Sequence, residues 1–74
     1  MNALEFDGAL YPVSAVRRAI SDYASIARIA IEETEKGCIC RIEASVAPME
    51  LTALEFANYV LELSCTEDRT HDSD

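Results

Sequence analysis

Two stretches with alternating apolar residues, joined by a short polar turn, constrain the fold of this chain most strongly. Residues 27–33 and 38–46 each place an apolar side chain at every second position, which is typical of strands that bury one face. Between them lies Thr34-Glu35-Lys36-Gly37, and Gly37 can take the positive φ that short hairpin loops often need. The residues expected to face the core are Ile29, Ile31, Cys38, Cys40, Ile42, Ala44 and Val46.

The register of this hairpin follows from its hydrophobic phase. A shift of one residue would turn one strand's apolar side chains to the wrong face, so loop length and phase must agree. They agree in one register, which also places a favourable ion pair on the outer face. The expected pairs are Glu33–Cys38, Ile31–Cys40, Ile29–Ile42 and, on the outer face, Arg28–Glu43.

Two helices flank the hairpin in the sequence. Residues 13–26 repeat apolar side chains at helical spacing, and Pro12 suits the entry to a helix because a helix start leaves its N–H groups unpaired. Residues 49–64 follow Pro48 in the same way, with Leu51 expected to be exposed. The expected core stripes are Val13, Val16, Ala19, Ile20, Tyr23, Ala24 and Ala27, and then Met49, Ala53, Phe56, Ala57, Val60 and Leu63, widened by Leu54 and Leu61.

Residues 3–10 predict a first strand, in which Leu4 and Phe6 alternate with acidic residues and Gly8 marks a bulge or the end. The order is then β-α-β-β-α. A right-handed crossover makes the first two strands parallel, and the hairpin places the third between them. We expect an α+β two-layer sandwich with sheet order 1-3-2 and both helices on one face, a ferredoxin-like unit lacking its last strand.

Length and charge limit the classes of function. The chain has 74 residues and a formal net charge of −8, so we expect one domain over residues 1–65 and a disordered acidic tail over residues 66–74. Acidic surfaces repel nucleic acid and anionic membranes, and we expect neither as a partner. The N-terminal residues lack the features of a signal peptide, and the odd number of cysteines favours reduced thiols in a cytoplasm.

The sequence holds no recognisable catalytic or metal-binding pattern. Cys38 and Cys40 would need Cys65 and His71 to complete a zinc site, but alternate strand positions favour buried thiols. His71 is the only histidine that could act as a base, and it lies in the expected tail. We therefore expect no enzyme activity and no cofactor, and a metal or redox module built on the cysteines is the least favoured alternative.

The last helix contains Phe56-Ala57-Asn58-Tyr59-Val60-Leu61-Glu62. This segment resembles the C-terminal signature of the HxsD family, small proteins of the His-Xaa-Ser peptide-modification system. Tyr59 and Leu61 match it, Phe56 matches as an apolar residue, and Glu62 stands where the family has arginine. The early strand and Tyr11-Pro12 before an alanine-rich helix also resemble the family's start. The resemblance implies an accessory protein that works beside radical enzymes on a peptide substrate.

These observations predict a small non-enzymatic domain that binds a protein or peptide, with a homodimer that has no peptide ligand as the alternative. The first strand is expected at an open edge of the sheet, where main-chain groups without a partner could accept an added strand. The expected partner-binding residues are Leu4, Glu5, Phe6 and Asp7. Pockets beside Leu4 and Phe6 would then select the side chains of the partner.

Overall fold

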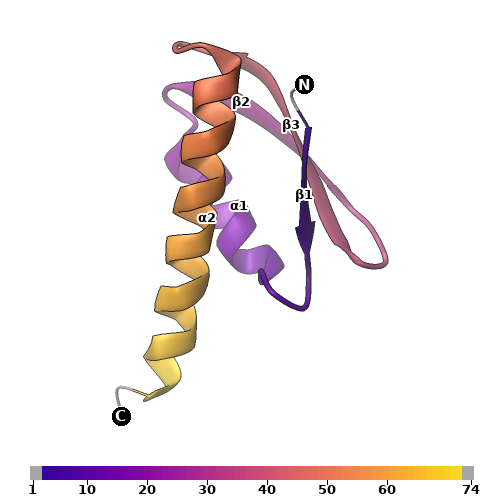
Figure 1. The fold of residues 1–74 in the computed structure, drawn as a ribbon, viewed down its shortest axis with the longest axis vertical. Helices are drawn as coiled ribbons and strands as arrows, with labels where there is room; N and C mark the ends of the chain where they lie inside the picture. The colour runs from indigo at the N-terminus through magenta and orange to yellow at the C-terminus, as the bar shows by residue number, and fades with distance from the viewer. Residues whose placement is uncertain (1–2, 73–74) are drawn as a thin grey trace.

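The chain forms a three-stranded sheet with two helices against it (Figure 1). In this computed structural model, residues 3–72 are described, with side chains over residues 3–65. The elements are β1 (Ala3–Asp7), α1 (Val13–Asp22), β2 (Ala27–Glu33), β3 (Gly37–Ser45) and α2 (Met49–Asp72).

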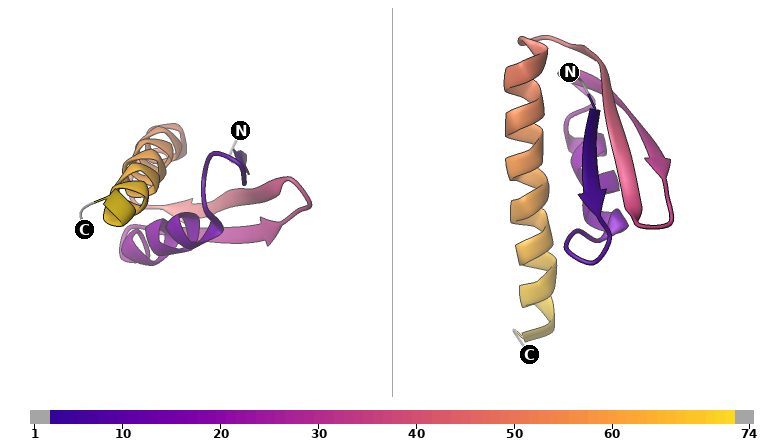
Figure 2. Two further views of the ribbon diagram at one scale, coloured as in Figure 1. Left: turned by 90° about the horizontal axis from the view of Figure 1, so that it is seen from below. Right: turned by 45° about the vertical axis from the view of Figure 1, so that its right-hand side comes forward.

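The sheet has the order β1-β3-β2, as the sequence predicts. Both β1 and β2 pair with β3 in the antiparallel sense, so they run parallel to each other. The view from below in Figure 2 shows α1 and α2 on the same side of the sheet, which leaves its other face uncovered. The expected α+β sandwich is therefore confirmed.

The hairpin keeps the predicted register only as far as Ile42. The pairs Glu33–Cys38, Ile31–Cys40 and Ile29–Ile42 are present, but the expected pair Arg28–Glu43 is wrong. A register shift between Arg28 and Ile29 sets Arg28 opposite Ala44, because a bulge adds one residue to β3 and displaces every position beyond it. Ala44 and Val46 are consequently exposed rather than inward. On the outer face, Arg41 and Glu32 form the ion pair instead, at 3.6 Å.

Gly37 has a different role from the one its place in the hairpin suggests. No glycine in the described part of the chain has positive φ, so the expected backbone conformation is wrong. The turn is closed instead by Thr34, whose Oγ1 accepts hydrogen bonds from the N–H groups of Lys36 (3.3 Å) and Gly37 (3.1 Å). Glycine is required because β1 passes very close: a Cβ at position 37 would lie 2.0 Å from the carbonyl oxygen of Phe6.

Both helices differ in length from the expectation. α1 ends at Asp22 rather than at residue 26, because residues 23–26 turn the chain into β2 and the N–H of Ala27 bonds to the carbonyl of Tyr23 at 2.8 Å. The backbone of α2 continues as helix to Asp72, past the expected end at residue 64. The side chains of residues 66–74 lie outside the described residues, and the tail expected there stays a prediction. Within residues 3–72, neither helix is long and apolar enough to cross a bilayer.

Aromatic side chains occupy the centre of the core. Phe56 of α2 is fully buried and meets Phe6 of β1 and Tyr23 edge to face, with ring centroids 6.0 and 5.5 Å apart. Phe6 also meets Tyr11 edge to face at 5.2 Å. These contacts fix β1 against α2 and so hold the edge of the sheet in place.

Candidate functional site

The outer edge of β1 carries main-chain groups that no strand pairs in the described part of the chain. The N–H of Gly8 donates to the carbonyl of Lys36 at 2.7 Å. Because hydrogen bonding alternates along an antiparallel pair, the main chains of Phe6 and Leu4 also face β3, opposite Cys38 and Cys40. The N–H and C=O of Glu5 therefore point away from β3, and β1 pairs with no other strand within residues 3–72.

Asp7 closes this edge at its C-terminal end. Its carbonyl accepts hydrogen bonds from the N–H groups of Leu10 (2.9 Å) and Tyr11 (2.8 Å), and its Oδ1 accepts one from Ala9 at 2.8 Å. The chain therefore turns away from the edge directly after Asp7. The N–H and C=O of Glu5 lie at the centre of the stretch that remains open.

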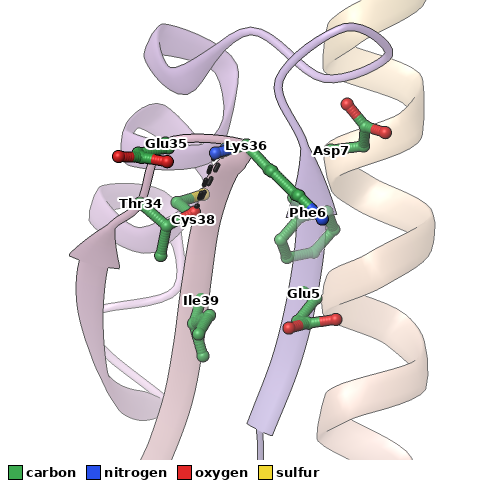
Figure 3. A pocket seen from close by; sticks show the side chains of 9 residues that line it. Glu5, Phe6, Asp7, Thr34, Glu35, Lys36, Cys38 and Ile39 are labelled. Carbon is green, nitrogen blue, oxygen red and sulfur yellow. Dashed lines mark hydrogen bonds between the residues drawn. The ribbon is translucent and has the colours of Figure 1, made fainter.

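An open hollow of about 580 Å³ lies beside this edge, where β1, β3 and the hairpin turn meet (Figure 3). In the register, Glu5 stands opposite Ile39, and both positions face the uncovered side of the sheet. Figure 3 shows the Lys36 side chain reaching from the turn toward β1. The lining residues are Glu5, Phe6, Asp7, Thr34, Glu35, Lys36, Gly37, Cys38 and Ile39.

The four residues predicted to bind a partner divide between two faces. Glu5 and Asp7 are exposed, whereas Leu4 is half-buried against the core and Phe6 is only 5% exposed. The Phe6 ring packs on Phe56 on the helix side, and Phe6 also lines the hollow, so selection by a pocket beside Phe6 stays a prediction. The hollow opens on the uncovered face, where Ile39 supplies the apolar surface.

Ile39 and the turn residues Glu35 and Lys36 were not predicted as site residues. Ile39 had a signal: it is a large apolar residue at an outward position of β3, between two inward cysteines. The turn residues had none, because their place in the hollow depends on how closely β1 approaches Gly37.

The three cysteines differ in how deeply they are buried. Cys38 and Cys40 are buried on β3, whereas Cys65 is exposed on α2. Burial raises the pKa of both buried thiols, to about 12 for Cys40, where the neighbouring Cys38 adds to the effect. No group of three or more Cys, His, Asp or Glu residues is arranged to hold a metal ion in the part of the chain whose side chains are described. The His71 side chain lies outside that part.

Tyr59, which carries the HxsD-like motif, links the two helices. Its hydroxyl donates to Oδ2 of Asp22 at 2.5 Å, and its ring lies 5.5 Å from that of Tyr23. The hydrogen bond to Asp22 raises the pKa of Tyr59. The hydroxyl therefore contacts the C-terminal end of α1.

Comparison of the chain with protein-family models, curated proteins and solved structures yields no match. The resemblance to HxsD proteins therefore stays a prediction that rests on the residues of α2 and the N-terminal segment.

Proposed function

We propose that this chain is a non-enzymatic domain that binds an extended peptide by strand addition at the edge of β1. The observation that carries the proposal is the unpaired main chain of Glu5 beside the hollow. Main-chain hydrogen bonds would supply affinity, and side chains that enter the hollow would supply selectivity. The fixed position of β1 against Phe56 limits the entropy lost on binding.

The charge around the edge favours a peptide with basic residues. Glu5, Asp7 and Glu35 line the hollow, and Lys36 is the single cation among its lining residues. A basic side chain of the added strand opposite Glu5 would form a favourable cross-strand pair. Ile39 lies opposite Glu5 on the same outer face and adds a half-buried apolar surface to the hollow.

A second copy of the chain fits this edge less well. Two-fold pairing of β1 with another β1, centred on Glu5, would set two glutamates directly opposite each other on the same face. Like charges in that position are destabilising. The formal charge of −8 on each copy adds further repulsion.

A role as an accessory factor in peptide modification rests on the resemblance of the Tyr59 segment to HxsD proteins. In that role the domain would hold an extended substrate peptide while a separate enzyme modifies it. Within residues 3–65 the domain has an open strand edge but neither a histidine nor a group of metal-binding residues, so the proposed part is recognition of the substrate.

The test compares two substitutions at one position. Glu5→Pro removes the N–H that points outward and leaves the bonds to β3 intact, because proline is tolerated where an edge N–H faces solvent. Glu5→Ala removes the same carboxylate and keeps the N–H. Peptides selected on the wild-type domain from a random displayed library serve as probes. We expect Glu5→Ala to retain binding within about tenfold and Glu5→Pro to abolish it, with both variants folded by circular dichroism.

Amide hydrogen exchange gives an independent measurement. Without peptide, the amide of Glu5 should exchange rapidly and that of Phe6 slowly, because only the second is bonded to β3. Bound peptide should protect the Glu5 amide. Equal binding by Glu5→Pro and Glu5→Ala, or protection confined to residues far from β1, would contradict the proposal.

A further inference from the structure

α2 has a second apolar stripe that the core does not use. Leu51, Leu54 and Leu61 are 47%, 61% and 48% exposed, although each is a large hydrophobic residue. Asn58 and Cys65 are exposed between and beyond them. The stripe, called the outer stripe below, consists of Leu51, Leu54, Asn58, Leu61 and Cys65.

The spacing of the outer stripe is that of a helix-to-helix seam. Its members follow one another at intervals of three, four, three and four residues, which is the a/d pattern of a heptad repeat. The stripe extends over about 21 Å at the helical rise of 1.5 Å per residue. It lies on the side of α2 away from Phe56 and Val60, which are fully buried, so it faces away from the sheet. The views in Figure 2 show neither α1 nor a strand on that side.

A polar residue in the middle of such a seam has a specific effect. Asn58 occupies an a position of the heptad, where an asparagine specifies the register and partner of a coiled coil at some cost in stability. A stripe interrupted in this way indicates selective binding of one partner helix rather than nonspecific hydrophobic association. It also predicts a polar residue at the facing position of the partner helix.

Glutamates border the outer stripe. Glu55 and Glu62 occupy e positions along one side, and Glu50 occupies the g position at the start of the other. All three side chains are exposed. In coiled coils these flanking positions determine the partner and its orientation through charge.

A second copy of α2 would meet these glutamates with glutamates. In an antiparallel pair the e positions face each other, which places Glu55 near Glu62 of the other copy. In a parallel pair the g position of Glu50 faces the e position of Glu55. Either arrangement places like charges together, which costs affinity and rejects the pairing.

We infer that the outer stripe of α2 docks an amphipathic helix of another protein, with leucine-like residues at its a and d positions and lysine or arginine beside them. This surface is distinct from the β1 edge and does not depend on it. The domain would then hold a peptide at the sheet edge and a partner protein on the far side of α2.

The test uses Cys65 as a native reporter, since it lies in the stripe and is the exposed thiol among the three cysteines. The probe is a synthetic helix with leucine at a and d, one asparagine at a central a position, and lysine at e and g. Two comparison peptides carry glutamate at e and g, or the lysine composition in scrambled order. We expect only the ordered lysine helix to slow alkylation of Cys65, at least about tenfold at saturation.

Substitutions then locate the contact. Leu54→Ser should weaken protection by the lysine helix about tenfold, because one leucine is no longer buried, and Glu55→Gln should weaken it less. Leu10→Ser is the matched control, because Leu10 is 70% exposed but lies between β1 and α1. This substitution should leave the protection of Cys65 by the lysine helix unchanged. Glu5→Pro should also leave protection unchanged, which separates this inference from the β1 proposal.

Three results would overturn the inference. The first is equal protection by the scrambled or glutamate-flanked peptide. The second is unchanged protection in Leu54→Ser. The third is a concentration-dependent homodimer of the free domain in which Cys65 is already shielded, since a second copy would then cover the stripe.

Discussion

Substitution of Gly37 by alanine tests how closely β1 and β3 approach. The added Cβ would lie 2.0 Å from the carbonyl oxygen of Phe6 and 2.6 Å from the nitrogen of Gly8, and both are backbone atoms that cannot rotate aside. To reach an ordinary contact, β1 must move away by more than about 1 Å, which breaks hydrogen bonds of ordinary 2.7–3.2 Å length. The bond from Gly8 to Lys36, at 2.7 Å, lies directly beside the clash.

The expected loss follows from the bonds affected. The Gly8 bond and the pair of bonds between Phe6 and Cys38 contribute about 1 kcal/mol each, so Gly37→Ala should cost about 3 kcal/mol. At about 0.05–0.15 kcal/mol per residue, the whole domain is stable by only about 4–11 kcal/mol. A loss of this size is therefore readily measured by urea denaturation, with the m-value (the slope of the unfolding free energy against urea concentration) held constant.

Gly8→Ala is the matched control at the same junction. Its Cβ would lie 3.3 Å from the carbonyl oxygen of Lys36, a contact that a shift of a few tenths of an ångström relieves. We expect it to cost less than about 1 kcal/mol. If the two variants have the same stability within about 0.5 kcal/mol, the close approach of β1 is not what requires glycine at position 37.

Three further predictions concern the core. Phe56→Ala should destabilise the domain by about 4 kcal/mol, a large part of its total stability, because a fully buried ring at the centre of the aromatic contacts is lost. Thermal denaturation that leaves Phe56→Ala as stable as Leu10→Ser would contradict this. Alkylation at neutral pH followed by mass spectrometry should modify Cys65 first and Cys40 last, because burial raises the pKa of Cys40 to about 12 and leaves almost no thiolate. The folded state holds the Cys40 thiol proton more tightly than the unfolded chain does. The stability that the protonated thiol contributes is therefore complete below pH 9 and decreases by about 1.4 kcal/mol per pH unit as the pH rises toward 12. Urea titrations should show that the free energy of unfolding declines less steeply with pH in Cys40→Ala than in the wild type.

The fold could be predicted where a residue pattern was compatible with a single arrangement of the strands. The alternation of Ile29 and Ile31 with Arg28, Ala30 and Glu32 allows one inward phase. The right-handed crossover makes β1 and β2 parallel, and the hairpin then places β3 between them. Those inferences needed only local periodicity and chirality, and the sheet order and the inner pairs of the hairpin confirm them.

The errors arose where tertiary geometry overrides a local pattern. The bulge beyond Ile42 has no local signal, and it removed the expected Arg28–Glu43 pair. Gly37 looked like a turn glycine, although the requirement comes from Phe6, a residue distant in sequence. Leu54 and Leu61 were assigned to the core because the width of an apolar stripe does not tell how many neighbouring elements cover it.

The candidate site was only partly accessible to sequence reasoning, for the same reason. That β1 lies at an edge follows from the topology, and the alternation of Glu5 with Phe6 follows from the period of two. The outward direction of the Glu5 main chain does not, because it depends on which residues of β1 bond to β3. The hollow beside it requires the hairpin turn and β1 in three dimensions.

Neither the outer stripe nor the open edge of β1 is used by the core of the domain. A fold of this kind needs one apolar face on each helix and one on the sheet, and the buried residues around Phe56 already meet that need. Replacing the exposed leucines of α2 would remove no contact from the core. An unpaired strand edge promotes association with other chains. In a domain this small, neither feature helps folding, whereas each would suit one of the proposed partners: an extended chain at Glu5 and a basic amphipathic helix along Leu54 and Leu61. Because the two surfaces lie on different elements, loss of one should leave the other intact, which is the behaviour expected of an adaptor and not of a single binding site.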